Sequence, residues 1–289
     1  MIAAIRSAEP ELATVEELCL TMEVSRSGFY AHKTKHLRPR CIQDAILSRE
    51  IRQAFEQSRN TYGTVRLRCD LRDLGHRCGR RRIARLMKKD RLEPVRKCRF
   101  VPKTTDSTHG RRASPQLLLN ASAPTKPREV WVTDITYIPT REGWLYLAAE
   151  IDLFSRRVVG WAAHATMATE LVLEAFNQAV AQAPSRLAGL VHHSDQGSQY
   201  ASDDFRKALK DLRVDQSMSR RGNCYDNAAA ESFWATLKTE CFNGYIAATR
   251  AEARSMIFDY IETFYNPVRR HSALGFISPV AFEKQTYNN

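Results

Sequence analysis

Three strand-like runs follow one another almost without a gap near the middle of the chain. They cover Val130–Pro139, Gly143–Leu153 and Arg156–His164, and each is rich in the β-branched and aromatic residues that favour strands. Only two or three residues connect successive runs, which leaves room for tight turns and not for helices. The sequence therefore predicts an antiparallel meander of three strands.

Helices and further strands alternate after this meander. A helical pattern over Thr169–Gln182 leads to a short apolar run at Leu190–His193. Ser202 is placed to cap another helix, and Val214–Met218 is typical of a last strand. Strands followed by alternating helices and strands give a mixed sheet with helices on its faces, so we expect an α/β domain.

Three acidic residues stand out in this region: Asp134, Asp195 and Glu231. Asp134 interrupts the first strand-like run, where a charge is costly unless it is paired or coordinates a metal. Asp195 follows the run that ends at His193, and Glu231 lies in an Ala-rich helical segment. Each of them alone would most often be a surface charge. Together, on rigid elements, they could hold two Mg²⁺ ions about 4 Å apart, an arrangement that suits phosphoryl transfer.

Positive charge is concentrated in the first part of the chain. Residues 1–130 contain 28 Lys/Arg and 14 Asp/Glu, a net charge of +14, whereas residues 131–289 contain 16 and 18, a net charge of −2. Such an excess is expected where a protein binds the phosphate backbone of DNA. A predicted helix over Gly79–Lys89 carries the densest cluster, which would repel itself without an anionic partner. We expect DNA contacts from its six cations: Arg80, Arg81, Arg82, Arg85, Lys88 and Lys89.

Other helical patterns precede and follow this cluster. Residues 14–30 predict a helix, a turn and a second helix capped by Ser25, which fits either a DNA-binding helix-turn-helix or a plain helical hairpin. Two amphipathic helices are predicted over Asp44–Gln57 and Thr61–Leu74, and Gly75 ends the second. Residues 101–127 have no clear period and a composition typical of a linker.

The end of the chain is also predicted to be helical. Arg250–Phe264 has a helical pattern, and Ser278-Pro279 is typical of the start of another helix. Between them, Arg269, Arg270 and His271 are either available to bind phosphates or part of an ordinary surface loop.

Five stretches carry motifs that occur together in one family: Trp131–Tyr137, His193–Tyr200, Arg221–Phe233, Lys238–Glu240 and Tyr265–Gly275. They resemble the bacterial insertion-sequence transposases related to retroviral integrases, specifically the product of the downstream reading frame (OrfB type). The resemblance covers essentially the whole chain and is densest from Trp131 onward. It implies an RNase H-like fold, with Asp134, Asp195 and Glu231 as catalytic metal ligands and Lys238 as a DNA contact.

The resemblance also implies an activity and partners. The enzyme would be a DDE transposase that uses Mg²⁺ to cleave DNA at insertion-sequence ends and to join the exposed 3′-hydroxyl to target DNA. Mn²⁺ should substitute, because all the ligands are oxygens. Double-stranded DNA, a homo-oligomer on DNA and an upstream-frame (OrfA) protein or fusion are the implied partners. Two alternatives stay open: an RNase H-like nuclease that cuts without joining, and a non-enzymatic, transposon-derived DNA-binding regulator.

Five parts make up the expected domain organisation, in which all-α helix-turn-helix modules precede the α/β domain. They are a helix-turn-helix-like segment (1–42), a basic helical DNA-binding module (43–100), a linker (101–127), an RNase H-like catalytic core (128–246) and a C-terminal helical extension (247–289). No apolar run approaches the ~18 residues that a membrane span needs. Seven scattered cysteines without a Cys-x-x-Cys pair fit reduced thiols. We therefore expect a cytoplasmic bacterial protein, associated with the nucleoid.

Overall fold

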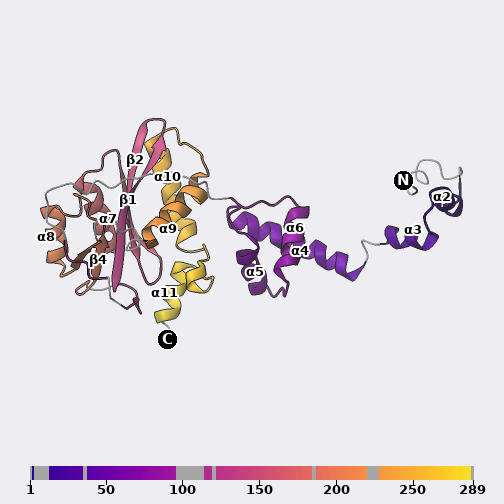
Figure 1. Cartoon of the computed structure of the whole chain (residues 1–289), viewed down its shortest axis with the longest axis horizontal. Helices are drawn as coiled ribbons and strands as arrows, with labels where there is room; N and C mark the ends of the chain where they lie inside the picture. Colours follow the sequence, from indigo (N-terminus) through magenta and orange to yellow (C-terminus); the bar gives the residue numbers. More distant parts are fainter. Residues whose placement is uncertain are drawn as a thin grey trace. The chain divides into compact units, whose positions relative to one another are not determined.

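The chain divides into two compact units. The computed structural model describes residues 2, 13–34, 38–95, 114–118, 122–183, 187–219 and 228–287. The first unit comprises residues 1–57 and 63–93, and the second comprises residues 58–62 and 94–289. Figure 1 shows the elements of both units along the chain. Each unit is built around buried apolar side chains of its own.

Two short helices at the start of the first unit have the predicted helix, turn, helix order. α2 (Val15–Thr21) begins at a capping box, in which the Glu17 N–H donates to Thr14 Oγ1 and the Thr14 N–H donates to the Glu17 carboxylate. α3 (Arg26–Lys33) begins after Ser25, whose hydroxyl accepts a hydrogen bond from the Gly28 N–H. The caps explain both helix starts and leave both functional interpretations of the pair open.

Three helices pack together in the rest of the first unit: α4 (Pro39–Gln57), α5 (Thr64–Asp73) and α6 (Arg80–Lys89). α4 begins five residues before the predicted Asp44, because the fixed φ of Pro39 suits the first helical turn, where its missing N–H costs nothing. α5 begins at Thr64 and not at the predicted Thr61, because Gly63 has an extended conformation as the N-cap. The remaining predicted boundaries, at Gly75 and Gly79, are confirmed.

A five-stranded mixed sheet, in the order β3-β2-β1-β4-β5, forms the centre of the second unit. Its strands are β1 (Val130–Thr140), β2 (Gly143–Asp152), β3 (Val158–His164), β4 (Val191–Ser194) and β5 (Asp215–Met218). The first three form the predicted antiparallel meander, whereas β4 runs parallel to β1 and β5 parallel to β4. The α/β prediction is confirmed. β3 starts two residues later than predicted, because Arg156 takes a left-handed turn conformation with φ of 61°.

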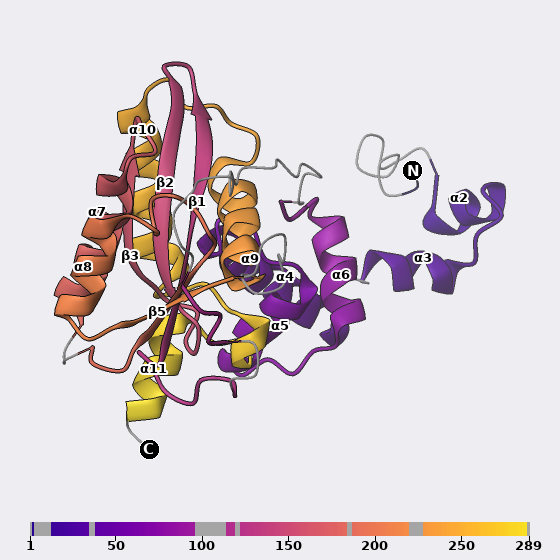
Figure 2. The ribbon, with the colours of Figure 1, turned by 60° about the vertical axis from the view of Figure 1, so that its left-hand side comes forward.

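Helices cover both faces of this sheet. They are α7 (Thr169–Gln182), α8 (Asp203–Asp211), α9 (Ala228–Leu237), α10 (Arg250–Phe258) and α11 (Pro279–Tyr287), with π-helical segments η3 (Lys238–Phe242) and η4 (Asp259–Tyr265) and a 3₁₀ turn η5 (Ser272–Leu274). α7 and α8 lie on one side of the sheet, and α9 and α10 lie on the other (Figures 1 and 2). The predicted helix over Arg250–Phe264 is therefore α-helical only in its first part.

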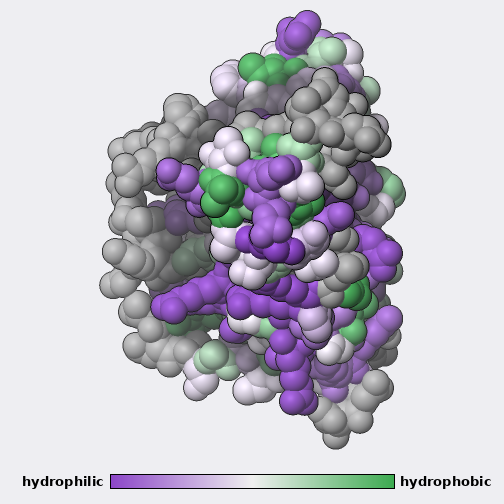
Figure 3. Space-filling view, turned by 90° about the vertical axis from the view of Figure 1, so that its right-hand side faces the viewer, coloured by the Kyte–Doolittle hydropathy of each residue, from purple (hydrophilic) through white to green (hydrophobic). Residues whose placement is uncertain are grey.

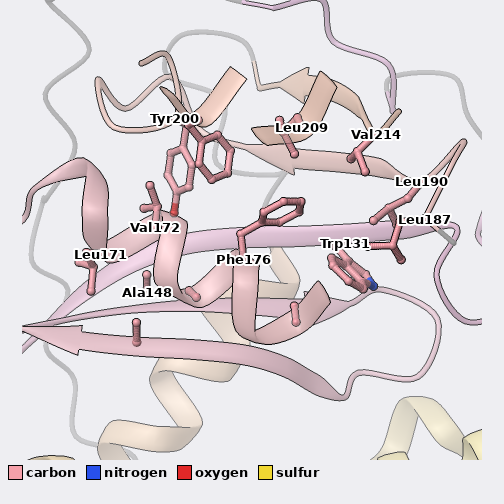
Figure 4. Close-up of a cluster of buried hydrophobic side chains, with 14 of the residues drawn as sticks. Trp131, Ala148, Leu171, Val172, Phe176, Leu187, Leu190, Tyr200, Leu209 and Val214 are labelled. Carbon is pink, nitrogen blue, oxygen red and sulfur yellow. The ribbon is translucent and has the colours of Figure 1, made fainter. Parts of the chain in front are cut away.

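The main core of the second unit lies between the sheet and the helices α7 and α8 (Figure 4). Phe176 of α7 packs edge-on against Trp131 of β1 and Phe205 of α8, with ring centroids 6.3 and 5.8 Å away. Gly160 of β3 allows α7 to approach, because a Cβ there would lie 2.3 Å from the Ala175 carbonyl oxygen. This packing fixes β1 and β4, the strands that lead to two of the predicted acids.

A middle part of the predicted linker, residues 114–118, lies along β5. The Met218 N–H donates to the Pro115 carbonyl oxygen at 3.2 Å, and the Leu117 N–H donates to Ser217 Oγ at 2.9 Å. Residues 114–118 are therefore bound to the edge of the sheet and are not a free connection. The preceding part of the predicted linker, from residue 101 to residue 113, lies outside the described residues.

The surface in Figure 3 is mainly hydrophilic, with apolar side chains in small separate patches. Of the helices that the structure describes, none has both the length and the apolar composition that a membrane span requires.

Candidate active site

The three predicted acids come from three elements that meet at the sheet. Asp134 lies in the middle of β1, Asp195 directly follows β4, and Glu231 lies in the first turn of α9. Val132 of β1 stands opposite His193 of β4 in the parallel pairing, and each aspartate lies two residues beyond its member of this pair. The register of two neighbouring strands therefore brings Asp134 and Asp195 close together.

Hydrogen bonds fix the two aspartates. The Asp134 carboxylate accepts from the Ile135 N–H at 2.9 Å and from Trp234 Nε1–H at 3.0 Å. Because Trp234 belongs to α9, this second bond holds the helix that carries Glu231 against the strand that carries Asp134. Asp195 Oδ1 accepts from the Gly197 N–H at 2.9 Å.

Burial and repulsion between carboxylates together determine the electrostatics of the site. Burial and then the negative charge of Asp195 raise the pKa of Asp134 to about 7, although hydrogen bonds from Ile135 and Trp234 act in the opposite direction. Glu231 adds a smaller upward contribution to the same pKa. An aspartate normally titrates near 4, so the protein groups around Asp134 leave its negative charge poorly compensated. A divalent cation would compensate it.

The donor set suits a hard metal ion. Carboxylate oxygens are the ligands that Mg²⁺ and Mn²⁺ prefer. Glu231 is exposed, and within the described parts of the chain no three His, Cys, Asp or Glu side chains are close enough to surround one ion. The two aspartates thus form the prearranged part of a candidate metal site. Glu231 is not close enough to them to surround the same ion in this arrangement. Residues 221–227, in the motif before α9, lie outside the described residues.

Asp134→Asn is expected to stabilise the metal-free protein above neutral pH. A carboxyl with a raised folded pKa keeps its proton in the folded state and loses it in the unfolded state between about pH 4 and about pH 7. The free energy of unfolding therefore falls as the pH rises through this window and stays low above it. The neutral amide avoids this loss, which is on the order of a few kcal/mol. In the presence of a chelator, the melting temperature of the variant should be higher than that of wild type at pH 8 and close to it at pH 4. A difference in melting temperature that does not change with pH would contradict the raised pKa of Asp134.

The element that carries Glu231 also brings Lys238 to the site. Lys238 directly follows α9, which ends at Leu237, and begins the π-helical segment η3. Its Nζ lies 5.0 Å from the centre of the Tyr137 ring on β1. Burial lowers the pKa of Lys238 below its usual value, and the negative charge of Asp134 offsets part of this effect. Lys238 is therefore a half-buried cation near the carboxylates.

The six cations of α6 fall into two groups. Arg82 Nε donates to Asp44 Oδ1 at 2.7 Å, and an Arg85 guanidinium nitrogen donates to Asp44 Oδ2 at 2.6 Å. The hydrogen bond from Arg85 is the main reason that the pKa of Asp44 is lowered. Asp44 therefore compensates the charges of Arg82 and Arg85 within the protein. The other four are exposed: Arg80, Arg81, Lys88 and Lys89.

Arg269 is not available to bind a phosphate, which corrects that interpretation of the C-terminal motif. It is buried, and two of its guanidinium nitrogens donate to Glu240 of η3 at 2.6 and 2.7 Å. Tyr260 Oη donates to the same carboxylate at 2.9 Å. Glu240 and Arg269 lie in two of the five motifs named above and carry opposite charges. This was a signal for the ion pair, and the sequence alone did not connect the two residues.

Another buried pair lies on the opposite face of the sheet from Asp134. His192 Nε2 and Glu150 Oε2 are 3.0 Å apart, and both side chains are fully buried. The sequence of β2 did not single out Glu150 as a buried acid.

Comparison with known proteins identifies the family. Two family models described as "Integrase core domain" match residues 124–224 and 212–279, and one described as "HTH-like domain" matches residues 42–100. The transposase for insertion sequence element IS904 of Lactococcus lactis is 41% identical over 88% of this chain and 100% of its own length. This chain belongs to the insertion-sequence transposase family.

Two other relatives and one solved structure are also similar to this transposase. An IS600 uncharacterized 31 kDa protein of Shigella sonnei is 46% identical over 93% of this chain and 98% of its own. Transposase InsF for IS3A of Escherichia coli is 35% identical, with 94% of each chain covered. A chain of the simian T-cell lymphotropic virus intasome matches 77% of the transposase and 70% of its own length, with 14% identity and a TM-score of 0.47.

These matches confirm the predicted family and the predicted function. The protein is a DDE transposase, a polynucleotidyl transferase that acts on DNA, with an integrase-type core of RNase H-like fold after a helix-turn-helix-like region.

Proposed function

We propose that the transposase holds Mg²⁺ through Asp134, Asp195 and Glu231 and, with it, cleaves and joins DNA strands at the ends of its insertion sequence. The observation that supports this proposal is the convergence of two aspartates, where burial and then the charge of Asp195 raise the pKa of Asp134 to about 7. Two bound Mg²⁺ or Mn²⁺ ions would activate the attacking oxygen and stabilise the charge on the leaving oxygen.

The protein groups around the acids keep the ligand atoms in place. The Ile135 and Gly197 N–H groups orient the Asp134 and Asp195 carboxylates from their own strand and loop. The bond from Trp234 to Asp134 keeps α9, and with it Glu231, at the same strand. A site built on strands and a helix is preorganised, so little reorganisation is needed when a phosphate enters.

Single-turnover incubation of the pure full-length protein with labelled element ends, target DNA and Mg²⁺ tests this function. Joined product supports the proposal. Cut but unjoined product would instead support an RNase H-like nuclease, and shifted but intact DNA would support a DNA-binding regulator.

We further propose double-stranded DNA, as element end and as target, for the basic first part of the chain. The match to an HTH-like domain at residues 42–100 supports a DNA-binding module at about 43–100. The integrase-core matches support a catalytic core from about residue 128, with the helical extension after residue 246. A homo-oligomer would hold two element ends together, and an upstream-frame (OrfA) protein would act as a fusion or a partner.

The exposed cations of α6 should determine how steeply DNA binding depends on salt. Each Lys or Arg that contacts a phosphate adds about −0.9 to the slope of log affinity against log salt, because it displaces counterions. Replacing Arg80, Arg81, Lys88 and Lys89 with Gln should therefore make the slope shallower by up to about 3.6 units. Four Gln substitutions at exposed Lys207, Lys210, Arg213 and Lys284 of the second unit serve as the matched control. An equal change in slope for both variants would contradict a DNA site on α6.

Lys238→Ala should slow strand joining without abolishing it. The half-buried ammonium is placed to bind a phosphate that adjoins the carboxylates. Loss of one hydrogen bond between charged groups should lower the joining rate by about tenfold. Joining rates over a range of DNA concentrations at saturating Mg²⁺ measure it, with exposed Lys284→Ala of α11 as control. If Lys238→Ala equals wild type at low DNA and elevated salt, Lys238 contributes only to packing on Tyr137.

A further inference from the structure

The tip of the β1–β2 hairpin carries the exposed tryptophan of this transposase. The structure describes all four tryptophans of the chain. Trp144 is 49% exposed, whereas the other three are at most 8% exposed: Trp131, Trp161 and Trp234. Burying a large aromatic side chain is strongly favourable, and its exposure on a rigid element often marks a contact surface.

Trp144 belongs to an aromatic and cationic cluster, which we call the hairpin platform and define as Tyr137, Trp144 and Lys238. The rings of Tyr137 and Trp144 meet edge-on with centroids 4.7 Å apart. Lys238 Nζ covers the Tyr137 ring at 5.0 Å. The platform therefore combines an open indole with a positive charge close by.

Backbone contacts hold the hairpin tip in one conformation. Thr140 Oγ1 donates to the Gly143 carbonyl oxygen at 2.6 Å, and the Arg141 N–H donates to the Ala247 carbonyl oxygen at 3.0 Å. Arg250 Nε donates to the Trp144 carbonyl oxygen at 3.0 Å. Because the tip is tied down from both sides, the indole of Trp144 would lose little freedom on binding a ligand.

An aromatic side chain next to a cation fits single-stranded nucleic acid. A base stacks on the ring while the cation binds the adjoining phosphate, and neither contact depends on the base sequence. Bases inside a duplex are already stacked on both faces, so the ring can reach only a terminal or unpaired base. We propose that the hairpin platform stacks an unpaired base of the DNA strand that is engaged in the active site.

The strand geometry limits which base this can be. Tyr137 lies three residues from Asp134 along β1, and Trp144 stands opposite Pro139, which lies five residues from Asp134. At about 3.4 Å per residue, these positions are about 10 and 17 Å from Asp134 along the strand. Both separations are odd, so the two rings leave β1 on the face opposite the Asp134 carboxylate, and the DNA strand would pass around β1 to reach them. The stacked base would therefore lie several nucleotides from the phosphate at Asp134. This placement depends on the proposed function, because it takes Asp134 as the position of the reacting phosphate.

A fluorescence experiment without divalent metal tests the platform separately from catalysis. The probe is a duplex with a five-nucleotide single-stranded extension that carries 2-aminopurine, and a fully paired duplex of the same length is the control probe. Wild-type protein should quench the 2-aminopurine and bind the extended duplex more tightly than the paired one. Trp144→Ala should bind the extended duplex about five- to a hundredfold more weakly and bind the paired duplex as wild type does.

Two further variants keep the outcome clear. Trp144→Phe keeps a stacking ring and should retain most of the quenching, which shows that a loss in Trp144→Ala does not come from misfolding. Phe258→Ala removes an aromatic side chain that is 55% exposed on α10 and should change neither probe. Equal binding of both duplexes by wild type, or an equal loss for both in Trp144→Ala, would overturn the proposal. So would a shift of Trp144→Ala to a smaller oligomer in sedimentation without a change in preference, because the tip would then be a contact between copies.

Failure of the proposed function would look different. Asp134→Asn should keep the wild-type quenching, because stacking needs no metal. Wild-type protein that quenches but does not join strands in Mg²⁺ would count against the proposed function and leave the platform supported.

Discussion

Replacing Asp134 or Asp195 with Asn, or Glu231 with Gln, is expected to lower strand cleavage and strand joining by about a thousandfold or more. Each substitution removes a carboxylate from the proposed metal site, and metal ions supply several kcal/mol of transition-state stabilisation. DNA affinity should stay within about twofold of wild type, because none of these residues is a cation that contacts phosphate. Single-turnover assays with labelled ends and gel shifts measure both quantities.

A matched control separates loss of a ligand from loss of negative charge. Asp211→Asn removes an exposed carboxylate at the end of α8, in the same unit, and should leave both activities unchanged. A triad variant that still joins strands at an appreciable rate in Mg²⁺ would remove its residue from the proposed site.

Breaking the buried pair between Arg269 and Glu240 should have the largest effect on stability. Arg269→Ala leaves the Glu240 carboxylate in a buried position with only Tyr260 as a hydrogen-bond donor among the contacts described above, and single deletions of this kind cost about 3–5 kcal/mol. The hydrogen bonds and charge of Glu240, which outweigh burial, hold the pKa of Arg269 above its usual range. Urea unfolding of the full-length protein should show this loss in the transition of the second unit.

The double variant Arg269→Met with Glu240→Met supplies the control. Apolar side chains of similar size avoid the unpaired charge, so most of the lost stability should return. If the double variant is as unstable as Arg269→Ala, the packing of these side chains and not their charges accounts for the effect. Because Glu240 lies two residues after Lys238 in η3, Arg269→Ala should also slow joining when the protein is still folded.

Local patterns explain why much of this fold was predictable. The meander follows from three strand-like runs with connections too short for a helix, and the caps at Ser25 and Ser202 follow from local side-chain chemistry. The placement of Asp134 and Asp195 needed one further step, the parallel register of β1 and β4. Strand propensities do not fix which strands pair, and the family motifs supplied that information.

Ion pairs between distant parts of the chain were not predictable in this way. With 44 Lys/Arg and 32 Asp/Glu in the chain, opposite charges alone cannot select Asp44 for Arg82 or Glu240 for Arg269. The π-helical segments η3 and η4 were also not predicted, because a search for the period of 3.6 residues finds α-helices only.

Counting the metal ions in the complex tests most directly whether the three acids form the catalytic metal site. Electron paramagnetic resonance of Mn²⁺, titrated into full-length protein bound to element ends, gives the number of ions per active site. Wild type and Asp211→Asn should bind two ions, and Asp134→Asn, Asp195→Asn and Glu231→Gln should each bind fewer, in step with their loss of joining. The same number of bound Mn²⁺ ions in Asp134→Asn and wild type would contradict the account.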